Sequence, residues 1–163
     1  MKTLSIFIFL LLNVSCNKEP KPAPVPALTP KDITLEDIVI NHNGTIIKYG
    51  FIGGWCSGID SLTIAANDLW YVKGAVCNET ASAKYLLISP QEKELLLKSF
   101  DQTAFDKLNV NTCYVCADGT DCWISVQHGT YFHKIRYGYG DSASITTIKK
   151  FVKELDRYMA KFK

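Results

Sequence analysis

Short stretches in which apolar and polar residues alternate run through most of the chain after residue 35. Alternation with a period of two is typical of β-strands that bury one face. Turn-forming residues separate these stretches, and Asn43-Gly44 is the clearest of them because this pair favours a two-residue hairpin turn. We therefore expect strands over 36–42, 45–52, 60–65, 69–76, 84–88, 110–116, 122–127 and 130–137.

Two segments carry the three- and four-residue spacing of an amphipathic helix instead. The first begins at Ser89, a capping residue, with Pro90 at the first helical position and Glu92 in the first turn. The second closes the chain, with lysines mostly on the side away from its apolar residues. Those apolar residues are Ile145, Ile148, Val152, Leu155, Met159 and Phe162. Runs of strands with separate helices predict an α+β fold: an antiparallel sheet of hairpins and a meander, with two main helices packed on one face.

The start of the chain has the pattern of an export signal. Met1 and Lys2 form a short basic start, residues 4–12 are apolar except for Ser5, and small residues precede Cys16. This segment resembles the signal of bacterial lipoproteins, which is cut just before a lipidated cysteine. We expect a signal peptide over 1–15 and attachment of lipid, palmitate included, to Cys16. An ordinary secretory signal with an incidental Cys16 is the alternative.

A proline-rich stretch follows the expected cleavage site. Residues 16–31 contain five of the six prolines, so we expect an extended, solvated tether, followed by a single domain over 32–163. The composition, 47% apolar and 21% charged, is sufficient for a buried core in that domain. We expect a bacterial envelope location with the lipid in the outer membrane, on its periplasmic or surface side. Without the leader and tether the formal charge is about −1, which argues against nucleic acid as a partner.

Five cysteines remain in the domain, and an exported protein usually pairs its cysteines in disulfides. A turn at residues 66–67 would place Cys56 opposite Cys77, and a three-residue turn at 118–120 would place Cys116 opposite Cys122. We therefore predict the disulfides Cys56–Cys77 and Cys116–Cys122, with Cys113 free. The chief alternative pairs Cys113 with Cys122 or with a cysteine of the earlier hairpin.

A zinc site is a weaker interpretation of the same residues. Cys113, Cys116, Cys122 and His133 are ligand types that zinc accepts. On the expected strand, however, Cys113 and Cys116 would point to opposite faces of the sheet. The same geometry disfavours a redox-active Cys-x-x-Cys pair, which is usually found at a helix start. We expect neither a metal nor another cofactor.

No established catalytic motif occurs in the chain, so we expect a binding module rather than an enzyme. Aromatic residues offer the binding surface, and we single out Trp55, Trp123 and Tyr139 because exposed aromatic rings suit protein or glycan recognition. A protein partner would fit an inhibitor or immunity role. The alternatives are an enzyme with a scattered site around Cys113 and His133, and a purely structural envelope protein.

Three segments resemble a family of uncharacterised domains found in bacterial secreted lipoproteins. They are GGWCSGIDSLTIAANDLWYVKG, ISPQEKELLLKSFDQTAFDKL, and the tail from CWISV through HKIRYGYGDSASITTIKKFVKELDRYM. The resemblance covers most of residues 45–160 and implies an envelope lipoprotein with an α+β domain. It lends no catalytic residues. The segment CYVCADGTDC departs from the family pattern, so the second predicted disulfide is expected to be particular to this chain.

Overall fold

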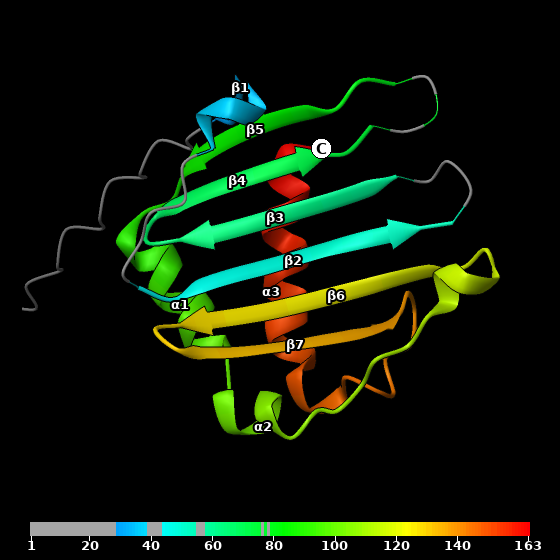
Figure 1. The fold of residues 1–163 in the computed structure, drawn as a ribbon. Helices are drawn as coiled ribbons and strands as arrows, with labels where there is room; N and C mark the ends of the chain where they lie inside the picture. Colours follow the sequence, from blue (N-terminus) through cyan, green and yellow to red (C-terminus); the bar gives the residue numbers. More distant parts are fainter. Residues whose placement is uncertain (1–28, 39–43, 55–57, 76, 78) are drawn as a thin grey trace, which may run out of the picture.

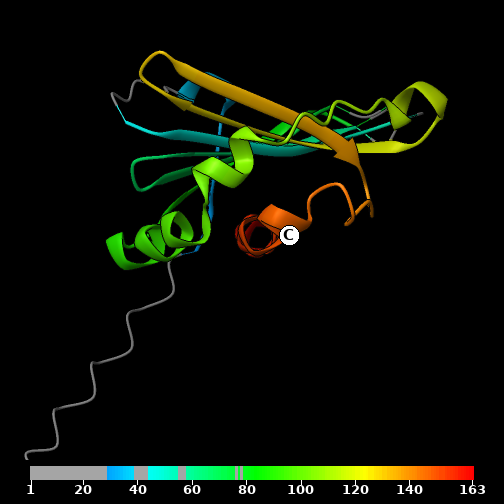
Figure 2. The ribbon, with the colours of Figure 1, turned by 90° about the horizontal axis from the view of Figure 1, so that it is seen from below.

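The fold is an antiparallel sheet covered on one face by helices (Figures 1 and 2). The computed structural model describes residues 29–38, 44–54, 58–75, 77 and 79–163. In these ranges seven strands pair in the order β1-β5-β4-β3-β2-β6-β7. The strands are β1 Lys31–Ile33, β2 Ile46–Gly53, β3 Ile59–Ala65, β4 Asp68–Lys73, β5 Ser82–Leu87, β6 Thr120–His128 and β7 Tyr131–Gly138. The predicted α+β fold class is confirmed.

The three α-helices of the described residues lie on the same side of this sheet, as the edge-on view in Figure 2 shows. They are α1 Pro90–Ser99, α2 Gln102–Asp106 and α3 Lys149–Met159, with 3₁₀ turns η1 Leu35–Asp37, η2 Tyr114–Ala117, η3 Thr146–Ile148 and η4 Ala160–Phe162. Helix α1 begins as predicted: Ser89 and Glu92 each bond the other's backbone N–H in a capping box. Helix α3 crosses behind the strands, and the apolar face predicted for the C-terminal helix is buried throughout.

Short turns join the strands of two hairpins: the β3–β4 turn lies where it is predicted, and the β6–β7 turn lies one residue later than the 128–129 turn between the predicted strands. In the β3–β4 hairpin Asp60 lies opposite Lys73 and Ala65 opposite Asp68, which is the register expected from a turn at residues 66–67. In the β6–β7 hairpin His128 lies opposite Tyr131, and Gly129 turns with a positive φ of 56°. Local turn chemistry therefore sets the pairing of β3 with β4 and of β6 with β7, on the two sides of β2.

The first predicted hairpin is wrong. Strand β2 pairs with β3 on one edge and with β6 on the other, so no edge remains for a strand from residues 36–42. Residues 35–37 form a 3₁₀ turn, and residues 39–43 lie outside the described ranges. Instead β1, which begins at Lys31, the last residue of the predicted tether, pairs with the outer edge of β5.

The strand predicted over 110–116 is also wrong. Only Asn111 makes a bridge, to Arg136 of β7, after which the chain turns into the 3₁₀ turn η2. The cause is the buried carboxylate of Asp121, which accepts hydrogen bonds from the backbone N–H groups of Tyr114 and Val115 at 3.1 Å each. A carboxylate that binds successive N–H groups holds the chain in a turn and prevents it from extending.

Candidate functional site

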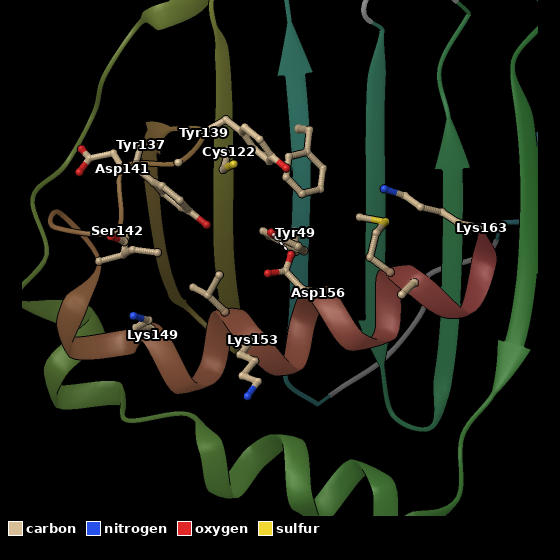
Figure 3. Close-up of a pocket in the computed structure, with 16 residues that line it drawn as sticks. Tyr49, Cys122, Tyr137, Tyr139, Asp141, Ser142, Lys149, Lys153, Asp156 and Lys163 are labelled. Atoms are coloured by element: carbon tan, nitrogen blue, oxygen red, sulfur yellow. Dashed lines mark hydrogen bonds between the residues drawn. The ribbon is translucent and has the colours of Figure 1, made fainter.

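A cavity of about 570 Å³ lies between helix α3 and the inner face of the sheet (Figure 3). One wall comes from strands β2, β6 and β7, and the other from α3 and the loop of residues 139–142 that follows β7. Cavities of a few hundred Å³ are the usual size for small-molecule sites. The cavity therefore has room for one compact ligand.

Sheet register places three side chains of the cavity wall in a row. Phe51 of β2 lies opposite Cys122 of β6, and Cys122 lies opposite Tyr137 of β7. Tyr49, two residues before Phe51, points to the same face of the sheet because side chains alternate along a strand. Its ring centroid lies 5.2 Å from that of Phe51 in an edge-to-face contact. The wall is thus mostly aromatic, with two phenol hydroxyls and one thiol.

The two phenol hydroxyls have different surroundings. Tyr49 is 2% exposed, and its hydroxyl donates a 2.6 Å hydrogen bond to Oδ1 of Asp156 on α3. Tyr137 is 3% exposed, and its hydroxyl has no partner at hydrogen-bond geometry among the described residues, although the Tyr49 hydroxyl and the Cys122 thiol lie near enough to influence its pKa. Figure 3 shows the Tyr137 hydroxyl pointing from β7 into the space below the sheet. A buried polar group without a partner is rare in folded proteins, because it loses its bond to water and gains none in return.

Burial also determines the protonation state of these groups. Burial, the neighbouring Tyr137 and the hydrogen bond to Asp156 raise the pKa of Tyr49 well above its ordinary value. Burial, together with the charges of Cys122 and Asp156, also raises the pKa of Tyr137 well above its ordinary value. Burial raises the pKa of the Cys122 thiol to about 12. At neutral pH the two phenols and the thiol of the sheet wall are therefore uncharged, and the wall carries no reactive thiolate.

The cavity opens between an aromatic ring and several charged side chains. Tyr139 is 70% exposed, and its ring makes an edge contact with Phe51 at 5.7 Å between centroids. Asp141 is engaged by its own loop, since the backbone N–H and the hydroxyl of Ser144 both donate to its carboxylate. Ser144 therefore holds the pKa of Asp141 below its usual range. Lys149, Lys153 and Lys163 also line the opening.

Among the predicted binding residues, only Tyr139 contributes to the cavity. Trp123 lies on the other face of the sheet, as its alternation with Ile124 predicts, and it is half-buried. Its ring covers Gly50, and Nζ of Lys134 lies 5.2 Å from the ring centroid. Trp55 lies outside the described residues. The structure therefore does not bring Tyr139 and Trp123 into one surface.

The cysteine pairing differs from the prediction. Cys113 is bonded to Cys116, whereas Cys122 is free and buried, so the predicted Cys116–Cys122 disulfide and the free Cys113 are both wrong. The predicted pairing placed Cys116 on a strand, but the turn η2 brings it back toward Cys113. Cys77 is disulfide-bonded, as predicted. Cys56, its predicted partner, lies outside the described ranges, as do the predicted signal peptide, Cys16 and most of the predicted tether.

The weaker zinc set is not assembled either. Cys113 and Cys116 are bonded to each other, and Cys122 faces the cavity instead. His133 lies over α2, where its Nε2 is 3.0 Å from the carbonyl oxygen of Leu108 and its ring meets Phe105 edge-on. Within the described ranges no three His, Cys, Asp or Glu residues form a group that could hold a metal. The proposed pair of Cys113 and His133 is also not formed, because the Cys113 sulfur is already bonded.

Sequence reasoning missed the residues that give the cavity its polar character, namely Tyr49, Tyr137 and Asp156. A partial signal existed for the two tyrosines, because each lies on the apolar side of an alternating strand where a hydroxyl must find a partner. No pattern in the neighbouring sequence identifies Asp156 as a cavity residue; it simply follows the buried Leu155 on the terminal helix. Its role depends on the way α3 crosses β2.

The chain matches no family model and no curated protein. The resemblance to uncharacterised lipoprotein domains therefore stays a prediction. Within the described part of the chain, every helix is too short or too polar to cross a membrane.

Proposed function

We propose that this chain is a lipid-anchored bacterial envelope protein whose domain is a binding module with its ligand site in the cavity beneath α3. The leader over 1–15, the cysteine at position 16 and the proline-rich tether support the anchor. The observation that carries the binding role is the buried Tyr137 hydroxyl, which no residue of the described ranges bonds at hydrogen-bond geometry and which lines the cavity. A bound ligand would supply the hydrogen bond that the fold does not.

The groups around the cavity favour the end of a glycan over a protein partner. The exposed ring of Tyr139, in contact with Phe51, offers an apolar surface on which the face of a sugar ring can pack. Tyr137 can donate to or accept from a sugar hydroxyl. Asp156 uses only Oδ1 for Tyr49, so its Oδ2 can accept from a second sugar hydroxyl. Together they match one sugar residue that presents an apolar face and two hydroxyls.

The same geometry favours binding over catalysis. An enzyme that uses a thiol needs a thiolate at working pH, but burial raises the pKa of Cys122 to about 12. A histidine base would have to reach the reacting group, but the His133 ring is held against Leu108 and Phe105 beside α2. The groups that remain are fitted to hold a ligand through neutral hydrogen bonds and ring contacts.

Saturation-transfer NMR and calorimetric titration with a panel of neutral, N-acetylated and acidic monosaccharides test this proposal. We expect at least one sugar to bind the wild-type domain and its affinity to fall about tenfold in Tyr137→Phe, which removes only the hydroxyl. Trp123→Phe, on the opposite face of the sheet, is the matched control and should leave the affinity unchanged. Equal binding by wild type and Tyr137→Phe, or binding that depends on Trp123, would contradict the assignment of the site.

The anchor is tested separately. Replacing Cys16 with alanine removes the proposed lipid attachment, so the protein should move from the membrane fraction to the soluble fraction. Mass spectrometry of the wild type should show a mature chain that begins at a lipid-modified Cys16. Retention of the Cys16→Ala variant in the membrane fraction would rule out this anchor without affecting the cavity.

A further inference from the structure

The disulfide between Cys113 and Cys116 lies at the surface of η2, and its neighbours line no part of the cavity. We propose that this disulfide is redox-active: it exchanges electrons with a partner that carries two thiols, and Arg136 favours Cys113 as the sulfur that leaves as a thiolate. This activity is independent of the binding function proposed above.

The loop keeps its shape through contacts that do not involve the disulfide. The carboxylate of Asp121, which is fully buried, accepts hydrogen bonds from residues on both sides of Cys113: the Thr112 hydroxyl at 2.9 Å and the Tyr114 N–H at 3.1 Å. The N–H of Thr112 also donates to the Arg136 carbonyl oxygen at 2.9 Å, and the ring of Tyr114 covers Gly138. Opening the disulfide would therefore leave the two sulfurs close together and able to re-form the bond.

A structural role for this disulfide is weak because it encloses so little chain. The two cysteines are only three positions apart. In the chain-entropy account, the stabilisation from a disulfide grows with the length of the loop that it closes, so a bridge of this length is at the low end. Both cysteines are exposed, which gives a partner thiolate access to either sulfur. Exposed disulfides are the class in which labile and catalytic bridges are found.

The charge around Cys113 distinguishes the two sulfurs. Nη2 of Arg136 lies 3.7 Å from Sγ of Cys113. A guanidinium beside a sulfur stabilises its thiolate form. The same Nη2 forms a 2.7 Å salt bridge with Asp121, which offsets part of the Arg136 charge, but the Asp121 carboxylate also accepts hydrogen bonds from Thr112, Tyr114 and Val115. Cys113 is therefore the better leaving group.

The exchange balances as a two-electron transfer. A partner thiolate attacks Sγ of Cys116, a mixed disulfide forms, and the bond to Cys113 breaks with its electron pair on the Cys113 sulfur. The partner's second thiol, as its thiolate, then attacks the partner's first sulfur in the mixed disulfide and releases Cys116. The partner ends as a disulfide and the chain as a dithiol, with the partner's two protons transferred to Cys113 and Cys116. The third thiol in this region, on Cys122, is buried and protonated, so it does not divert the reaction.

The first test measures the redox equilibrium of the folded full-length chain. The protein is equilibrated in mixtures of reduced and oxidised glutathione, trapped by acid, alkylated, and analysed by peptide mass spectrometry. We expect Cys113 and Cys116 to be reduced and reoxidised together without loss of the near-ultraviolet circular dichroism signal, while Cys77 stays oxidised. Reduction of Cys113 and Cys116 only after unfolding would overturn the proposal.

The second test measures the reactivity of Cys113. In Cys116→Ser the remaining sulfur should react with iodoacetamide at an apparent pKa below about 8.5, the ordinary value for a thiol. Adding Arg136→Gln should slow this reaction about tenfold at pH 7, whereas adding Arg136→Lys, which keeps the charge, should slow it less. Circular dichroism checks that each variant is folded. If the Arg136→Gln variant does not fold, the rate of the Arg136→Lys variant decides whether residue 136 affects the reactivity of Cys113. An ordinary pKa for Cys113, or rates that do not respond to residue 136, would overturn the role of Arg136.

Discussion

Removing one oxygen atom from Tyr137 should make this protein more stable. The Tyr137→Phe substitution leaves the ring in place between β6 and α3 and deletes only the hydroxyl, which is buried and has no partner among the described residues. In the unfolded chain that hydroxyl is bonded to water, so folding loses a hydrogen bond at this position. Phenylalanine avoids the loss.

The size of the effect follows from the burial of the ring. Leaving a buried donor or acceptor unsatisfied costs about 1–3 kcal/mol, and Tyr137 is 3% exposed. Because the adjoining cavity of about 570 Å³ can admit water, we expect the lower part of that range. Tyr137→Phe should raise the free energy of unfolding by about 1–2 kcal/mol and the melting temperature by about 3–8 °C.

Tyr49→Phe is the matched control, since the same atom is removed from an equally buried ring two strands away. The Tyr49 hydroxyl donates to Asp156 at 2.6 Å, so its deletion breaks a hydrogen bond to a carboxylate. We expect a loss of about 1 kcal/mol, because Asp156 is exposed and regains water. Urea unfolding followed by tryptophan fluorescence gives both values. Destabilisation by Tyr137→Phe, or equal changes in the two variants, would mean that the Tyr137 hydroxyl is satisfied and that the cavity lacks its central polar group.

Three further substitutions test the supports of the fold. Asp121→Asn should destabilise the domain by about 3 kcal/mol at pH 7, because it leaves Arg136 half-buried without its charge partner. Burial raises the pKa of Asp121, but the hydrogen bonds from Val115, Tyr114, Thr112 and Arg136 outweigh it and hold this pKa below its usual range. The stabilisation that ionised Asp121 gives to the fold is therefore complete above about pH 3.9 and is lost as the pH falls through the folded pKa. Acid unfolding curves of the Asn variant should lack this pH-dependent loss of stability. Ser89→Ala should cost about 1 kcal/mol in thermal unfolding, because it removes the capping box of α1. Gly50→Ala should cost more than Ser89→Ala, because its Cβ would lie 2.5 Å from the Asp60 carbonyl oxygen and 2.8 Å from the Trp123 ring, and a smaller loss would show that Trp123 can move aside.

The parts of the fold that the sequence predicts are those decided by neighbouring residues. The β3–β4 register follows from the two-residue turn at 66–67, and the start of α1 follows from Ser89, Pro90 and Glu92. The errors arise where a distant residue decides. Asn43-Gly44 is a strong turn signal, yet β2 has both edges occupied by β3 and β6, the latter about 75 residues away in the chain. The 110–116 segment alternates like a strand, yet Asp121 bends it.

The cavity was beyond local prediction for the same reason. It depends on a row of side chains from β2, β6 and β7, and on the angle at which α3 crosses them. Alternation alone predicts that Tyr49 and Tyr137 face the core, but not which of their hydroxyls meets Asp156. The sequence offers Tyr139 only as one of several aromatic residues, and its exposure beside the cavity is a finding of the structure.

The first residues of β6 connect the two proposed sites while keeping them chemically separate. Asp121 and Cys122 are adjacent in the chain and point to opposite faces of the sheet, so Asp121 holds the Cys113–Cys116 loop while Cys122 lines the cavity. Because none of the hydrogen bonds to Asp121 comes from either cysteine, we expect those bonds to persist when the disulfide opens. The strand beneath the cavity is thereby insulated from the redox state of the loop. We therefore expect a substitution at Tyr137 to leave electron exchange unchanged, and a substitution at Cys116 to leave ligand binding unchanged.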